Sequence, residues 1–186
     1  NYHALTGKLE KRLSGGVEFI SSYTWSHAIA NSGTPLTWAS ATNPLDFRTA
    51  YANALWDIRH NFTTGFTYEV PVGKGRALGA DMSSALNHVV GGWSLNGILS
   101  LRTGQPLTLG YNGCQGVWGS CRPDIVAGKD PNNAPPGGRS ASKWFDTSAL
   151  TNPAPLTPGN SGAYNVRRPG TSTLDASLFK TFSLTE

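Results

Sequence analysis

Apolar and polar side chains alternate with a period of two along five stretches of the chain. These stretches cover residues 5–13, 17–26, 61–70, 93–102 and 174–182. A period of two is typical of a β-strand that has one apolar and one polar face. Ser14, Gly15 and Gly16 separate the first two stretches and predict a tight hairpin turn. The pattern therefore predicts an all-β protein.

The alternation also assigns residues of the last three stretches to the two faces of a sheet. Successive side chains of a strand point to opposite faces, so residues two apart share one face. The expected polar face carries Thr63 and Asn96. The expected apolar face carries Phe62, Phe66, Leu95, Leu99 and Leu178.

The connections between the stretches differ strongly in length. Two long loops, about residues 26–57 and 104–170, are rich in Asn, Gly, Pro and Ser, whereas the connection 71–92 is shorter and allows a helical turn within residues 78–90. Soluble domains rarely hold two structureless loops of this size. An outer-membrane barrel has long extracellular loops and short periplasmic turns. We therefore expect antiparallel up-and-down strands of an outer-membrane-type barrel, as one partial segment of about five strands over residues 1–186.

Large aromatic residues lie at the expected ends of the strands. In an up-and-down order, Tyr2 and Trp25 fall at one end of the first hairpin, and Tyr68 and Trp93 fall at the opposite end of the third and fourth strands. Barrels carry aromatic girdles at both membrane interfaces. The alternative is that these aromatics fill the core of a soluble β-sandwich.

The low fraction of charged residues and the scattered basic residues restrict the kinds of partner that we expect. Only 14% of the residues are charged, against about 25% in an average soluble domain. The net charge is +4, but the basic residues are scattered, so we expect no nucleic-acid partner. The chain begins without Met, and we expect it to be a fragment of a longer polypeptide.

The chain has two cysteines, which lie close together in the second long loop. Cys114 and Cys121 could close a disulfide in an oxidising compartment, which would fit an extracytoplasmic location. Two free thiols or a metal contact are the alternatives.

Catalytic motifs are not apparent. The four histidines are dispersed, and the chain contains neither an H-E-x-x-H nor a G-x-S-x-G motif. A serine such as Ser22 or Ser26 could approach Asp57, Arg59 and His60 across strands. An ion pair between Asp57 and Arg59 at the base of the first long loop is the stronger expectation. Asp124 and Asp130 lack the spacing of a calcium loop. We predict no enzymatic activity, no cofactor and no metal site.

The long loops are better candidates for ligand contact, because recognition commonly resides in exposed loops on a rigid scaffold. Aromatic rings can stack on sugars or on aromatic ligands. Alternatively, the aromatic side chains of the long loops hold these loops together through hydrophobic contacts. The candidate ligand-binding residues are Trp38, Tyr51, Trp56, Tyr111 and Trp118.

Seven short motifs of the chain together resemble a known family. The chain resembles the C-terminal β-barrel region of TonB-dependent outer-membrane receptors, in particular the Oar-like group with a carboxypeptidase-regulatory-like domain. The motifs occur in the order of that family and extend over nearly the whole chain. They are YHALTGKLEKR (2–12), SYTWSH (22–27), DIRHNF (57–62), YEVPVGKG (68–75), GGWSLNG (91–97), GQPL (104–107) and LDASLFK (174–180).

The resemblance implies ligand binding and uptake across the bacterial outer membrane. The implied partners are outer-membrane lipid and, through the full-length receptor, a periplasmic energy-coupling protein. Five strands are fewer than the usual minimum of about eight for a closed barrel, so assembly into a homo-oligomer is a further expectation. The alternatives are a soluble or fibre-forming all-β protein that assembles through exposed strand edges, and a secreted hydrolase.

Overall fold

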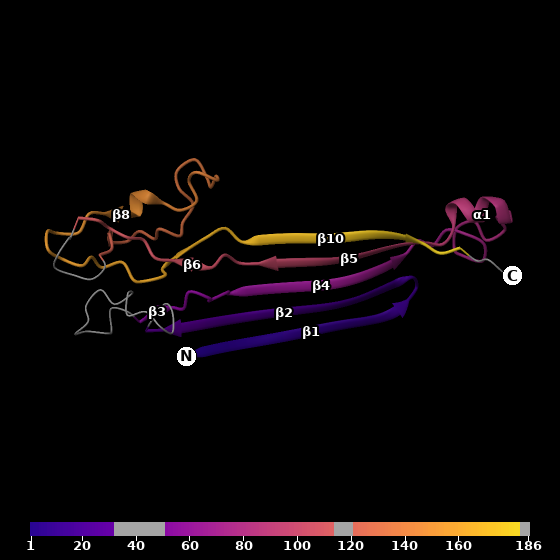
Figure 1. Ribbon diagram of the computed structural model, residues 1–186, viewed down its shortest axis with the longest axis horizontal. Coiled ribbons are helices and arrows are strands. Elements are labelled where there is room, and N and C mark those ends of the chain that lie inside the picture. The colour runs from indigo at the N-terminus through magenta and orange to yellow at the C-terminus, as the bar shows by residue number, and fades with distance from the viewer. Residues whose placement is uncertain (32–50, 114–120, 183–186) are drawn as a thin grey trace. The chain divides into compact units, whose positions relative to one another are not determined.

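The computed structural model describes residues 1–31, 51–113 and 121–182. Its largest sheet has the strand order β1-β2-β4-β5-β10, and β3 pairs with β2 outside this path. Successive arrows alternate in direction (Figure 1). These strands are β1 (Tyr2–Ser14), β2 (Val17–Ala30), β3 (Ala52–Asn53), β4 (His60–Glu69), β5 (Trp93–Arg102) and β10 (Thr171–Lys180).

All five strands expected from the alternation are present, so the all-β, antiparallel fold is confirmed. The second strand is longer than expected, because β2 continues to Ala30 and the first loop begins later than residue 26. Ile29 and Ala30 pair with the short β3, and the Ser26 N–H donates to the Arg59 carbonyl at 3.0 Å. The extension depends on partners far along the chain, which the local pattern does not reveal.

The register confirms the expected faces. Phe62 pairs with Leu101 and Phe66 pairs with Gly97 between β4 and β5. Leu95 pairs with Leu178 between β5 and β10. Because paired residues share a face, the apolar side chains of three strands form one continuous surface.

Most leucines of this apolar face are exposed, whereas Phe62, Phe66 and Leu99 are half-buried. Leu174 and Leu178 are 60% and 61% exposed. A soluble sandwich would bury such side chains against a second sheet. A contiguous exposed apolar surface marks contact with a membrane or with another protein.

The chain folds as two compact units. The strand unit comprises residues 5–24, 60–102 and 171–186, and the loop unit comprises residues 1–4, 25–59 and 103–170. Most of the five long strands therefore belong to one unit, and most of the two long connections belong to the other.

Short connections join strands within the strand unit. Gly15 and Gly16 both have positive φ, 62° and 77°, as the turn between two closely paired strands requires. The connection from β4 to β5 contains α1 (Ser84–Val90), which confirms the expected helical turn. The Ser83 side chain caps α1 by accepting from the Leu86 N–H.

The second long loop, expected without regular structure, instead contains short elements. β6 (Pro106–Leu107) pairs with β9 (Val166–Arg167), and β7 (Asp124–Ile125) pairs with β8 (Leu150–Thr151), which follows the 3-10 helix η3 (Thr147–Ala149). Two-residue strands give no periodic signal, so the sequence pattern could not predict them. Small side chains such as Ala149 and Ala163 are buried within this segment.

Candidate functional site

Asp57 is the buried centre of a polar cluster in the loop unit. Its side chain is fully buried and accepts a hydrogen bond from the Ala28 N–H at 2.6 Å. The Arg59 Nε donates to its Oδ2 at 2.9 Å, which confirms the expected ion pair. Arg167 forms a second ion pair with the same oxygen.

Arg167 also binds backbone oxygens of two different segments. Its Nη1 donates to the Asp57 carbonyl and to the Gly104 carbonyl, at 3.2 Å each. The Arg167 carbonyl accepts from the Trp144 indole N–H at 2.9 Å. The guanidinium therefore joins the end of the first long connection to both ends of the second. No sequence motif indicates this role, because Arg167 lies 110 residues from Asp57.

Asn53 of β3 extends the cluster. Its Oδ1 accepts from Arg59 Nη2 at 3.0 Å and lies 3.2 Å from His27 Nε2, while its Nδ2 donates to the Tyr164 carbonyl at 3.0 Å. Tyr164 has a positive φ of 52°, and its N–H donates to Thr108 Oγ1 at 3.0 Å. Side-chain hydrogen bonds thus hold β2, β3 and the second long connection together.

The electrostatics of the cluster favour an ionised carboxylate. Burial by itself raises the pKa of Asp57, but the hydrogen bonds from Ala28, Arg167 and Arg59 outweigh it and lower the pKa below its usual range. A carboxylate held in this way is charged at neutral pH. It serves as a fixed acceptor that orders the segments around it.

The groups considered for hydrolysis are engaged in other interactions. Ser26 Oγ donates to the Ile58 carbonyl at 2.6 Å. His60 Nδ1 shares a hydrogen bond of 2.7 Å with Tyr23 Oη, and the two rings are stacked. Ser26 thereby links β2 to the segment just before β4, and the His60–Tyr23 contact links the first residue of β4 to β2.

The aspartates considered for calcium cap turns. Asp124 Oδ1 accepts from the Asn160 N–H at 2.6 Å, and Asp130 Oδ1 accepts from the Asn132 N–H at 2.8 Å. Within residues 1–31, 51–113 and 121–182, no three His, Cys, Asp or Glu side chains gather as metal ligands.

Of the five candidate aromatics, the structure describes three. Tyr51 and Trp56 are 54% and 51% exposed in the loop unit. Tyr111 is half-buried, and its N–H donates to the Cys121 carbonyl at 2.8 Å. Trp38, Trp118 and Cys114 lie outside the described residues, so their roles and the disulfide with the buried Cys121 stay predictions.

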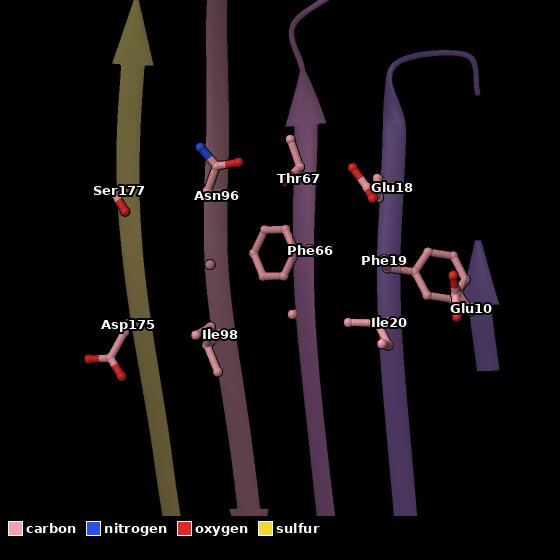
Figure 2. Close-up of a pocket in the computed structure, with 12 residues that line it drawn as sticks. Glu10, Glu18, Phe19, Ile20, Phe66, Thr67, Asn96, Ile98, Asp175 and Ser177 are labelled. Carbon is pink, nitrogen blue, oxygen red and sulfur yellow. The ribbon is translucent and has the colours of Figure 1, made fainter. Parts of the chain in front are cut away.

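The polar face of the strand unit is hollowed. Register places Gly65, Ile98 and Asp175 in one row across β4, β5 and β10. The hollow has a volume of about 480 Å³, and Glu10 and Glu18 also line it (Figure 2). Carboxylates and a few apolar side chains therefore share a water-accessible surface.

Both aromatic pairs lie toward the expected ends of their strands. Tyr68 pairs with Leu95, and the Val70 N–H donates to the Trp93 carbonyl at 2.9 Å, so Tyr68 and Trp93 lie together at the short-turn end. Tyr2 is the first residue of β1. Trp25 lies in the second half of β2, so Tyr2 and Trp25 both fall toward the end of the first hairpin that is opposite its tight turn, as expected.

Up-and-down strands with one apolar face and one polar face are typical of outer-membrane barrels. The family model described as "Outer membrane beta barrel domain" matches residues 1–186. The chain belongs to this family. No curated protein and no solved structure matches the chain.

Membership in the outer membrane beta barrel domain family places the protein in the outer membrane. Strands of such domains alternate between a lipid-facing and a lumen-facing side. The barrel domain thus has the two kinds of face that its family requires. Among its described residues, no helix is long and apolar enough to cross a bilayer.

Proposed function

We propose that this barrel domain is a segment of a TonB-dependent outer-membrane receptor that binds and takes up a ligand without catalysis. Its apolar face lies against outer-membrane lipid. The polar face lines the lumen, and a periplasmic energy-coupling protein acts through the full-length receptor. The seven motifs of the sequence and the family membership support this proposal.

The observation that carries the ligand-binding part is the buried cluster around Asp57. Two arginines and a backbone N–H hold one carboxylate and thereby join segments about residues 28, 57 and 167. Loops that are fixed in this way lose little conformational entropy when they bind a ligand. The cluster therefore suits a preformed binding surface.

Tyr51 and Trp56 would supply the contacts. Both rings are about half exposed, and Tyr51 Oη accepts from Asn1 Nδ2 at 3.3 Å, which restrains its ring. Exposed aromatic rings stack on the flat faces of sugars and of aromatic groups. The proposed ligand class is therefore a sugar or an aromatic chelate.

A titration of the full-length protein in detergent tests this function. Oligosaccharides and ferric catecholate chelates are the probes, and heat of binding is the measurement. We expect Trp56→Ala to weaken the binding of one probe class at least tenfold, and Trp93→Phe, at the short-turn end of the strand unit, to leave binding unchanged. Uptake of the bound probe must also require the energy-coupling protein. Equal affinity in both variants would contradict the assignment of Trp56.

A second function has one specific observation in its favour. Within the described sheet, β1 and β10 each pair on one side only. Unpaired strand edges can join chains into fibres. Sedimentation without detergent separates the two functions: an ordered, pelleting assembly with a strand repeat would favour the fibre, and detergent-dependent solubility would favour the receptor.

A further inference from the structure

The helix α1 has an exposed apolar side. Leu86 and Val89 are 51% and 66% exposed, and their spacing of three residues places them on one side of the helix. Ala85 completes this side in sequence. None of the residues of α1 is buried. A water-facing helix of a soluble protein would direct Leu and Val toward a core.

The opposite side of α1 is fixed to its own connection. Asn87 Oδ1 accepts from the Lys74 N–H at 2.8 Å, and the Gly91 N–H donates to the Asn87 carbonyl at 2.9 Å. The Ser83 side chain caps the first turn. The orientation of α1 is therefore determined by polar contacts, and these contacts direct Leu86 and Val89 outward.

The C-terminal end of α1 is bound to the apolar face of the sheet. Trp93 pairs with Lys180 in the register, and both share a face with Leu95 and Leu178. The Trp93 indole N–H donates to the Val89 carbonyl at 3.2 Å. The apolar face thus continues from the strands through Trp93 to the exposed side of α1.

Lys180 completes this junction. Its Nζ donates to the carbonyls of Val89 and Gly91, at 3.0 and 2.7 Å, and lies 4.7 Å from the centre of the Trp93 ring. A cation at a helix C-terminus is favourable, and lysine and tryptophan prefer the level of lipid headgroups. The composition and position of this junction fit a membrane interface.

We propose that α1 is a membrane-surface helix: Leu86 and Val89 enter the boundary between headgroups and acyl chains of the leaflet at the short-turn end. Trp93 and Lys180 mark the depth of that boundary. The inference rests on the proposed contact between the apolar face and lipid. It adds that the bilayer is also the partner of the connection between β4 and β5, which lies outside the strands. Such helices bind through apolar area on one side and polar groups on the other.

Spin labels test the position of α1 in the full-length protein, reconstituted into vesicles of phosphatidylethanolamine and phosphatidylglycerol. A nitroxide is attached through a keto amino acid at position 86, 89, 84 or 178, one at a time, so that the cysteines are unchanged. Ser84 lies about 200° around the helix from Leu86 and is the matched control. Collision rates with oxygen and with a water-soluble nickel chelate are measured.

We expect the ratio of oxygen to nickel collisions to be several-fold higher at positions 86, 89 and 178 than at position 84. A high ratio at 178 with low ratios at 86 and 89 would overturn the membrane-surface helix and leave the lipid-facing strands intact. A low ratio at 178 would overturn the lipid contact of the apolar face, and the inference with it.

Discussion

The ring of Phe66 lies over Gly97, the residue that it faces across β4 and β5. A Cβ atom added at Gly97 would lie 2.7 Å from Phe66 Cζ and 3.1 Å from the carbonyl oxygen of Asp175. Gly97 is buried, although Leu95 on the same face of β5 is exposed. An aromatic ring that covers a strand glycine compensates for the side chain that the glycine lacks.

Gly97→Ala should therefore destabilise the sheet. The added methyl group displaces the ring and meets a backbone oxygen that cannot move alone, and overpacking of this kind costs about 1 to 3 kcal/mol. Gly7→Ala is the matched control, because nothing lies within 4 Å of a Cβ added there. Urea unfolding of both variants in detergent measures the difference. Equal free energies of unfolding would contradict the packing of Phe66 on Gly97.

Asp57→Asn should loosen the loop unit. The substitution leaves Arg59 and Arg167 without their anion, and breaking a buried pair costs about 3 to 5 kcal/mol, less here because both arginines are partly exposed. We expect faster cleavage by thermolysin within residues 103–170. Glu69→Gln removes the exposed pair with Arg76, which is worth at most about 1 kcal/mol, and should leave cleavage unchanged.

The same carboxylate predicts a pH dependence. The folded pKa of Asp57 is lowered, so its stabilisation is complete above the pKa of an unfolded aspartate, about 3.9, and is lost as the pH falls through the lower folded value. Near-ultraviolet circular dichroism of the tryptophans should therefore change below about pH 4. In Asp57→Asn this acid transition should be absent. An identical transition in both proteins would assign it to other groups.

Arginine substitutions distinguish the two faces. At the midplane of a bilayer, Arg on the lipid-facing side costs about 2 to 4 kcal/mol, so Leu99→Arg should lower the free energy of unfolding in vesicles by that amount. Thr63→Arg and Asn96→Arg on the polar face should cost far less. Equal costs on both faces would indicate a sheet that protein buries on two sides.

Much of the strand unit follows from local sequence. The alternation in residues 61–70 and 93–102 predicted β4 and β5 almost to their ends, and their register preserved the expected faces. A strand can be recognised from its period of two and from a turn signal at its end, such as Gly15 and Gly16. The ends of the strands were predicted less accurately; β2, for example, continues to Ala30.

The sequence by itself determined the strands, their two faces and the pair of Asp57 with Arg59, because all of these depend on neighbours a few residues apart. Only the tertiary structure brought Arg167 to Asp57 and Lys180 to the end of α1. Both contacts join residues about 90 to 110 positions apart. Contacts between residues this far apart require the closure of a long loop, which depends on the packing of the whole chain. No local sequence pattern indicates which residues will meet.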